Sequence, residues 1–238
     1  MKLTDFSTLT FDCYGTLIDW ETGIAEALEP WMERHSLRIG REDLLKAFGR
    51  CESARQAERP GALYPEILAS VMHDLGEQFG ARVNADEAEE FGQSVKDWPE
   101  FPDSPEALTY LAGHYKLVIT SNIDRASFRH SNGKLGVAFD LIITAEDVGS
   151  YKPAPGHFES AMAQLADMGI GKDKILHTAQ SLYHDHVPAK AFGLASIWIN
   201  RQAGRAGATT RPDIDVKPDW EVPSMAAMVY MHQQHLAG

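Results

Sequence analysis

The feature that most constrains this chain is a series of short apolar runs that alternate with segments of helical character. Residues 106–113 and 155–168 show the helical pattern. Such alternation is typical of βαβ units and of a buried parallel sheet, so the sequence predicts an α/β fold. The segments that we predict as strands are residues 7–11, 116–120, 139–144, 174–177 and 195–199.

The stretch between the first two predicted strands has a different texture. Residues 21–34 fit one helix face, and residues 41–98 continue in helical style with breaks at 59–61 and at Gly80. No convincing strand lies in this stretch. It ends at PEFPDSP (99–105), which is rich in residues that break helices and strands. We therefore expect one main domain with a large helical insertion.

Composition and charge exclude several classes of function. The 238 residues carry a net charge of -12 and no basic patch, which argues against nucleic acid and anionic membranes as partners. The two cysteines have no CxxC spacing. The N-terminus lacks the apolar core of a signal peptide, and no run approaches the roughly 20 apolar residues that span a bilayer. We expect a cytoplasmic protein.

Polar side chains follow the predicted strands at the points where the strands end. In parallel sheets, ligands bind beyond the carboxyl ends of the strands. A carboxylate, a hydroxyl with an amide, a lysine and a second carboxylate should therefore meet at one edge of the sheet. These residues are Asp12, Ser121, Asn122, Lys152 and Asp185.

Four segments carry a resemblance to a known family. FDCYGTLIDW (11–20), ITSNID (119–124), YKPAP (151–155) and QSLYHD (180–185) resemble the four motifs of the haloacid dehalogenase superfamily. The resemblance implies a Rossmann-like core formed by residues 1–18 and 103–238, with residues 19–102 as an inserted helical cap. It also implies that Asp12 is the nucleophile.

Two positions depart from the phosphatases of that superfamily. Phosphatases carry a second Asp where this chain has Tyr14, and usually another where it has Gln180. Those acids serve proton donation and magnesium binding, which a dianionic phosphate requires and a halide leaving group does not. With WINR (198–201) and PDWEV (218–222), this pattern resembles the L-2-haloacid dehalogenases. We therefore expect no metal and no other cofactor.

The resemblance implies hydrolytic dehalogenation of a small 2-haloacid. Asp12 would displace halide from Cα and form a covalent ester, and water would attack that ester, so that configuration inverts. Lys152 would lower the pKa of Asp12 and aim it, and Asp185 would balance Lys152 and orient the water. Thr16 and Ser121 would hold carboxylate oxygens, and Asn122 would fix its loop.

The substrate carboxylate calls for an arginine, which related dehalogenases take from the cap. Arg50 and Arg55 are both candidates, and we favour Arg50. Tyr14, Ser121 and Ser181 complete the predicted substrate-binding set. Phe158 stands where those enzymes tend to have a tyrosine, and the QSLYHD loop also departs from their pattern.

Other interpretations remain open at this stage. A site of this kind could open a strained cyclic amino acid such as azetidine-2-carboxylate, act as a magnesium-dependent phosphatase, or bind a ligand without turnover. The compact His184-Asp185-His186 group, with His177, invites a metal interpretation, but no ligand spacing accompanies it. Related enzymes are often dimers, so a homodimer is also expected. The stretch 201–217 is predicted to be a long loop.

Overall fold

A single parallel sheet forms the centre of the protein. The computed structural model describes residues 1–202 and 214–238. The strand order is β3-β2-β1-β4-β5-β6, and every neighbouring pair is parallel, which confirms the predicted α/β fold. The strands are β1 (Thr8–Phe11), β2 (Lys116–Ser121), β3 (Leu141–Thr144), β4 (Ile175–Ala179), β5 (Ala195–Ile199) and β6 (Trp220–Val222).

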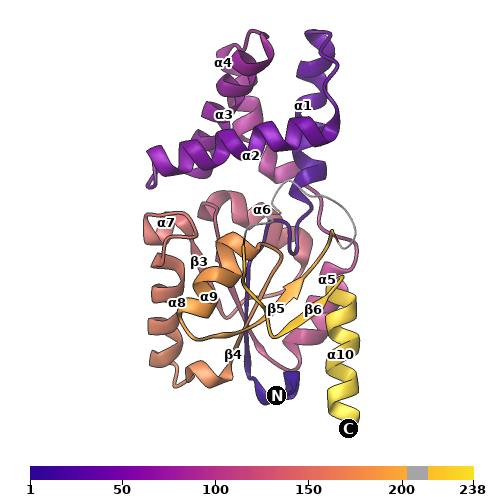
Figure 1. The fold of residues 1–238 in the computed structure, drawn as a ribbon, viewed down its shortest axis with the longest axis vertical. Helices are drawn as coiled ribbons and strands as arrows, with labels where there is room; N and C mark the ends of the chain where they lie inside the picture. The colour runs from indigo at the N-terminus through magenta and orange to yellow at the C-terminus, as the bar shows by residue number, and fades with distance from the viewer. Residues whose placement is uncertain (203–213) are drawn as a thin grey trace.

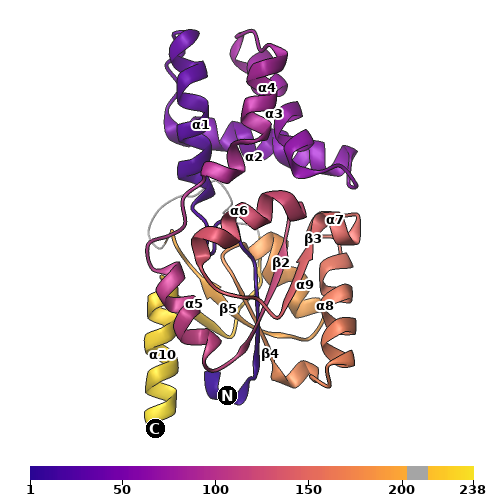
Figure 2. The ribbon, with the colours of Figure 1, turned by 180° about the vertical axis from the view of Figure 1, so that it is seen from behind.

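Helices cover both faces of this sheet. Figures 1 and 2 show α8 and α9 over one face and α5, α6 and α10 over the other. Within the described residues, no helix is both long and apolar enough to cross a membrane. The α-helices are α1 (Trp20–Arg34), α2 (Arg41–Glu58), α3 (Tyr64–Phe79), α4 (Ala85–Gly92), α5 (Ser104–Ala112), α6 (Arg125–Leu135), α7 (Ala145–Val148), α8 (Gly156–Asp167), α9 (Val187–Ala191) and α10 (Met225–Ala237). Shorter helical turns are η1 (Leu3–Asp5), η2 (Ser94–Asp97), η3 (Lys172–Lys174) and the π-helical η4 (Leu182–His186).

The central strands were predictable because both of their faces are buried. All four residues of β1 are buried, and its sequence TLTF combines apolar residues with β-branched threonines, which favours a strand. The sequence missed β6, which lies within the PDWEV segment. This edge strand has three residues, of which only Val222 is buried, so it carries no apolar run. Of the loop predicted at 201–217, residues 203–213 lie outside the described residues.

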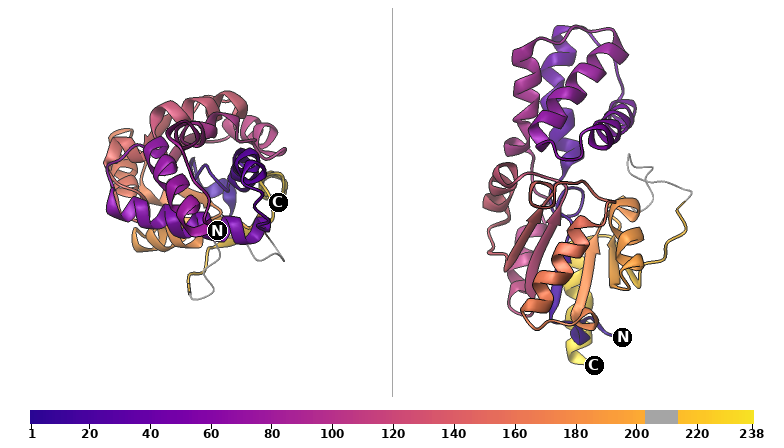
Figure 3. Two further views of the ribbon diagram at one scale, coloured as in Figure 1. Left: turned by 90° about the horizontal axis from the view of Figure 1, so that it is seen from above. Right: turned by 90° about the vertical axis from the view of Figure 1, so that its left-hand side faces the viewer.

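The helical insertion sits over one end of the sheet. Helices α1 to α4 and η2 come between β1 and α5 in the chain, and Figures 1 and 3 show them stacked beyond the sheet, opposite the end where both termini lie. Gly23 in α1 lets this layer pack closely, because a Cβ there would meet the Trp98 side chain at 2.3 Å. The helical layer thus has its own tightly packed interior.

Candidate active site

A pocket lies where the sheet reverses its strand order. From β1 the chain adds β2 and β3 on one side, then crosses back to place β4 on the other side of β1, and this reversal opens a crevice at the strand ends. Gly15, at φ +93°, allows the tight turn that follows Asp12. The pocket is lined by Asp12, Tyr14, Trp20, Glu52, Gln56, Tyr64, Ser121, Asn122, Lys152, Gln180, Ser181, His184 and Asp185.

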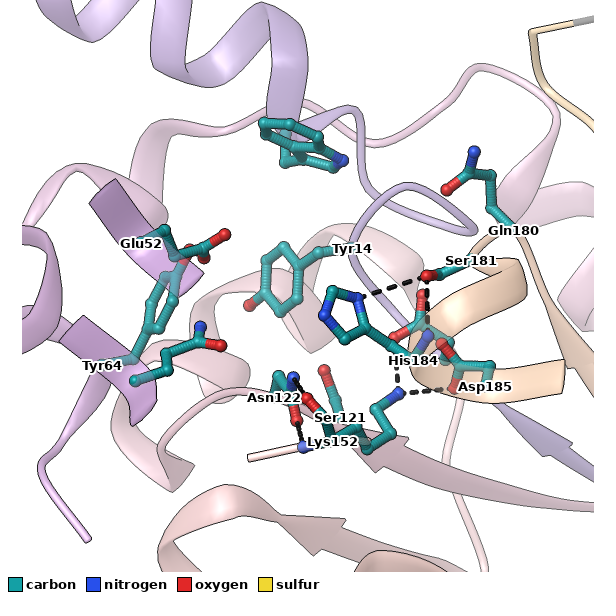
Figure 4. Close-up of a pocket in the computed structure, with 13 residues that line it drawn as sticks. Tyr14, Glu52, Tyr64, Ser121, Asn122, Lys152, Gln180, Ser181, His184 and Asp185 are labelled. Atoms are coloured by element: carbon teal, nitrogen blue, oxygen red, sulfur yellow. Dashed lines mark hydrogen bonds and ion pairs between the residues drawn. The ribbon is translucent and has the colours of Figure 1, made fainter. Parts of the chain in front are cut away.

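A buried lysine joins the two carboxylates at the floor of this pocket (Figure 4). Lys152 Nζ donates to Asp12 Oδ1 at 2.9 Å and to Asp185 Oδ1 at 2.7 Å. Its third hydrogen bond goes to the carbonyl oxygen of Thr120 at 2.9 Å. All three N–H donors of the ammonium are therefore used, and its position is fixed between the two acids.

The two carboxyl groups experience this lysine differently. Burial raises the pKa of Asp12 above its ordinary value, and the nearby Asp185 adds to the rise, although Lys152 opposes it. Burial also acts to raise the pKa of Asp185, but Lys152 and His177 outweigh it and the net shift is downward. The sequence predicted that Lys152 would lower the pKa of Asp12. Lys152 does act in that direction, but the cost of burying the charge is larger, so the net shift of the Asp12 pKa is upward.

The lysine itself keeps its charge in this environment. Burial alone would lower the pKa of Lys152, but the two carboxylates raise it overall. Asn122 holds the backbone that carries Lys152, since its amide donates to the Lys152 carbonyl at 3.1 Å and accepts from the Lys152 N–H at 2.6 Å. Asn122 therefore secures the loop, as its position in the sequence predicted.

Thr16 holds the second oxygen of Asp12. Its hydroxyl donates to Asp12 Oδ2 at 2.8 Å and accepts from the Gln180 N–H at 2.9 Å. Each oxygen of Asp12 thus accepts one hydrogen bond from the protein. A carboxylate oxygen retains a lone pair after accepting one hydrogen bond, so the group is aimed while remaining able to attack.

Ser121 presents a hydroxyl that the protein does not use. Its Oγ is buried and has no hydrogen-bond partner among the described residues. The adjacent backbone is fixed, because His157 Nε2 lies 3.0 Å from the Ser121 carbonyl oxygen. Burial lowers the pKa of His157 to about 4, so the ring is neutral and can donate to that carbonyl. A buried hydroxyl without a partner is costly unless a ligand satisfies it.

The remaining predicted residues also reach the pocket. The Tyr14 hydroxyl lies 2.8 Å from Ser131 Oγ. Ser181 Oγ accepts from the His184 N–H at 3.1 Å and lies 3.2 Å from its Nδ1. Asp185 Oδ1 is also 3.2 Å from His177 Nε2. Its Oδ2 has no hydrogen-bond partner among the described residues.

The structure does not bring the predicted arginines to this pocket. Arg50 is exposed on α2 and is not among the lining residues. Arg55 is held at the surface by Asp74 and Glu58 through hydrogen bonds of 2.5–2.8 Å. The cause is the phase of α2, which turns other residues toward the sheet. Phe158 is likewise absent from the pocket, because it packs in the core against the His177 ring.

Three lining residues of the helical layer were missed from the sequence. Glu52 and Gln56 come from α2, and Tyr64 opens α3. The Tyr64 hydroxyl donates to Glu52 Oε1 at 2.6 Å. One signal was available: Glu52 and Gln56 continue the helical spacing of the buried Phe48, at i+4 and i+8. Polar residues on an otherwise apolar helix face indicate that this part of the face lines a polar pocket rather than the hydrophobic core.

The histidines near the site are engaged separately. His177 lies between Thr10 and Asp185, whereas His186 contacts the Ala179 carbonyl and Ser196. In the described ranges, 1–202 and 214–238, no group of three or more His, Cys, Asp or Glu side chains is arranged to hold a metal ion.

Comparison with known proteins identifies the family. A family model described as haloacid dehalogenase-like hydrolase matches residues 6–178. The chain belongs to this family. It is 27% identical over 227 residues to an (S)-2-haloacid dehalogenase of Pseudomonas fluorescens, covering 92% of each chain. A second (S)-2-haloacid dehalogenase, from Pseudomonas putida, is 26% identical over 228 residues and covers 92% of this chain and 93% of its own.

A solved structure agrees over nearly the whole chain. The L-2-haloacid dehalogenase from Xanthobacter autotrophicus, with chloropropionic acid covalently bound, superposes with a TM-score of 0.76 at 18% identity. The match covers 96% of this chain and 98% of that one. The relatives confirm the resemblance to the 2-haloacid dehalogenase branch, and the superposition confirms the fold.

Proposed function

We propose that this hydrolase releases halide from a small 2-haloalkanoic acid and yields the 2-hydroxy acid. The observation that carries the proposal is the single ammonium of Lys152 held between Asp12 and Asp185. A lysine in that position compensates the charge of the carboxylates and holds Asp12 in place for attack on carbon. The named activity of the 26–27% identical relatives is the same chemistry.

In the proposed reaction, Asp12 attacks the carbon that bears the halogen. The C–O bond forms as the C–halogen bond breaks, and halide leaves with the electron pair. Thr16 and Lys152 hold the attacking carboxylate in place, which removes much of the entropic cost of orienting it. Residues 19–102 serve as a cap that shields the resulting ester from bulk water.

The second half-reaction is hydrolysis of the ester. The free oxygen of Asp185 takes a proton from a water molecule, and that water attacks the carbonyl carbon of the Asp12 ester. As the bond between the carbonyl carbon and the substrate oxygen breaks, Asp185 returns its proton to the departing alkoxide, and the 2-hydroxy acid leaves. The proton left on the Asp12 carboxyl group passes to solvent, which restores both carboxylates. Because only the first step acts at Cα, configuration inverts. Ser121 receives the substrate carboxylate, since its buried hydroxyl lacks a protein partner.

Halide release from a panel of 2-chloro and 2-bromo acids, assayed with EDTA present, tests this proposal. We expect sustained release that Asp12→Asn abolishes. Asp173→Asn is the matched control, since Asp173 is exposed in η3 and lies outside the pocket. A single turnover in 18O-water should label Asp12 before it labels product. Direct labelling of product would contradict the ester intermediate, and magnesium-dependent phosphate release without halide release would point to a phosphatase.

A further inference from the structure

An acidic side chain, Glu52 of α2, lines the pocket on the side formed by the inserted helices. Figure 4 shows Glu52 and Tyr64 across the pocket from Lys152 and Asp185, with Tyr14 between them in that view. The Tyr64 hydroxyl fixes one oxygen of Glu52. No hydrogen bond or ion pair within the described residues engages the other oxygen. A polar wall of this kind selects for a polar group on the ligand.

No protein cation neutralises Glu52 within the described part of the chain. Arg55 is bound to Asp74 and Glu58, and Arg50 is exposed away from the pocket. Burial raises the pKa of Glu52 to about 7, with no cation opposing the shift. The group is therefore an acid that gains from an incoming positive charge.

The charges of the whole pocket also favour a ligand that carries a positive group. The floor holds the Lys152 ammonium against the carboxyl groups of Asp12 and Asp185, and Glu52 adds a further acid. Among the described residues that line it, Lys152 carries the one permanent positive charge, and its three donors are already used. A substrate that is only anionic gains no ionic partner from this arrangement. A zwitterion gains one.

We propose that Glu52, aimed by Tyr64, binds a protonated amine of the substrate, so that the site takes small 2-substituted carboxylic acids that also carry an ammonium group. This inference rests on the proposed function, because it places the carboxylate near Ser121 and the reacting carbon near Asp12. The ammonium then donates to the unpaired oxygen of Glu52. Gln56, one helical turn further along α2, offers its side-chain carbonyl to a second N–H.

The ammonium preference can be measured by binding, apart from turnover. Calorimetry would compare 4-amino-2-hydroxybutanoate with 2-hydroxybutanoate, and 5-amino-2-hydroxypentanoate with 2-hydroxypentanoate. At pH 8 we expect the wild type to bind at least one amino acid of these pairs about tenfold or more tightly than its unaminated partner, the effect of a hydrogen bond between charged groups. Glu52→Gln should remove most of that preference.

Two further variants separate recognition from folding. Tyr64→Phe releases Glu52 without removing its charge, so the preference should fall but persist. Glu58→Gln is the matched control, because Glu58 is an exposed acid on the same helix and lies outside the pocket. It should leave the preference unchanged.

The outcomes distinguish this inference from the proposed function. Equal affinity for both members of each pair, a preference that survives in Glu52→Gln, or no binding of either amino acid at millimolar concentration overturns the ammonium site. Halide release from 2-chloropropionate, measured on the same wild-type sample, tests dehalogenation separately. Halide release without an amine preference sinks the inference alone. An amine preference without halide release from any haloacid leaves the ammonium site standing and sinks dehalogenation.

Discussion

The two sides of the pocket are built on different principles. At the strand ends, the nucleophile lies in a closed network, in which Lys152 uses all three donors and both oxygens of Asp12 are held. The Ser121 hydroxyl and one oxygen of Asp185 remain for the substrate and for water. The helical side is open, and one oxygen of Glu52 has no protein partner in the described residues. The closed side fixes the attacking group, whereas the open side leaves polar capacity for a ligand.

The difference teaches where chemistry and specificity reside in this chain. Groups that react must be preorganised, and their charges are balanced inside the protein before substrate arrives. Groups that determine substrate specificity need a polar atom without a protein partner, which the correct ligand pairs with and a wrong ligand leaves unpaired. On this view, changes within the hydrogen-bond network of Lys152 should cost turnover and stability together. Changes at the helical wall should alter which substrate is accepted.

The largest effect is expected from removing the central cation. Lys152→Met removes the ammonium that two buried carboxyl groups share, so the free energy of unfolding should fall by about 3–5 kcal/mol. Halide release should fall on the order of 10^3-fold, since Asp12 loses its aim and its charge balance. Urea unfolding and halide assays measure the two effects. Lys174→Met, at an exposed lysine, is the control and should alter neither. A stable Lys152→Met protein would refute the closed-network description.

The next effect separates function from stability at Ser121. Ser121→Ala should lower kcat/KM by roughly 10- to 100-fold, mainly through a higher KM, because the substrate carboxylate loses a hydrogen bond. Stability should stay level or rise, since a buried hydroxyl without a partner is removed. Thr178→Val removes another such hydroxyl outside the pocket, so it should raise stability without changing KM. A marked loss of stability in Ser121→Ala would mean that the hydroxyl serves the fold.

The burial of Glu52, on the helical side of the pocket, should make the stability of the protein depend on pH. The folded-state pKa of Glu52 is about 7, above an ordinary value of 4.5. Between these values the folded protein binds more protons than the unfolded chain, so the free energy of unfolding falls as pH rises. This stabilisation is complete below about pH 4.5 and lost above about pH 7. Glu52→Gln lacks the dependence, so its stability relative to wild type should grow by roughly 1–3 kcal/mol across that window.

The control for this linkage is Glu58→Gln. Glu58 is exposed, and its pairing with Arg55 lies at the surface. Its unfolding curves should run parallel to those of the wild type from pH 4.5 to pH 7.5. Parallel curves for Glu52→Gln as well would mean that water in the pocket solvates the Glu52 carboxylate.

The same contrast explains how much the sequence could predict. Asp12 directly follows β1, Ser121 ends β2, and Asp185 lies in η4, the turn that follows β4. The buried strands before them could be predicted from the sequence. Parallel strands deliver such residues to one edge whatever the details of packing. The sequence did not predict the order of the strands, because that order depends on which strands pair in space. It did not predict β6 either, because this short edge strand has only one buried residue.

Helix phase limited the prediction on the other side. In α2, a shift of one position rotates a side chain by about 100°. From the segment FGRCESARQ (48–56) we predicted that Arg50 or Arg55 lines the pocket, whereas Glu52 and Gln56 line it. The sequence predicted that Lys152 lowers the pKa of Asp12 but not the larger opposing effect of burial, since burial and the proximity of Asp185 are properties of the folded chain.

The smallest effect is expected at Arg50, the arginine that we favoured from the sequence. Arg50 is exposed and faces away from the pocket, so Arg50→Ala should leave kcat/KM within about twofold of the wild type. Arg55→Ala should also spare kcat/KM, while it lowers stability by up to about 1 kcal/mol through the loss of its pairs with Asp74 and Glu58. A tenfold rise in KM confined to Arg50→Ala would show that α2 rotates over the substrate and would place a cation on the helical wall. In that event both sides of the pocket would carry a cation, the helical side only once substrate is bound. The ammonium preference of Glu52 should then be absent.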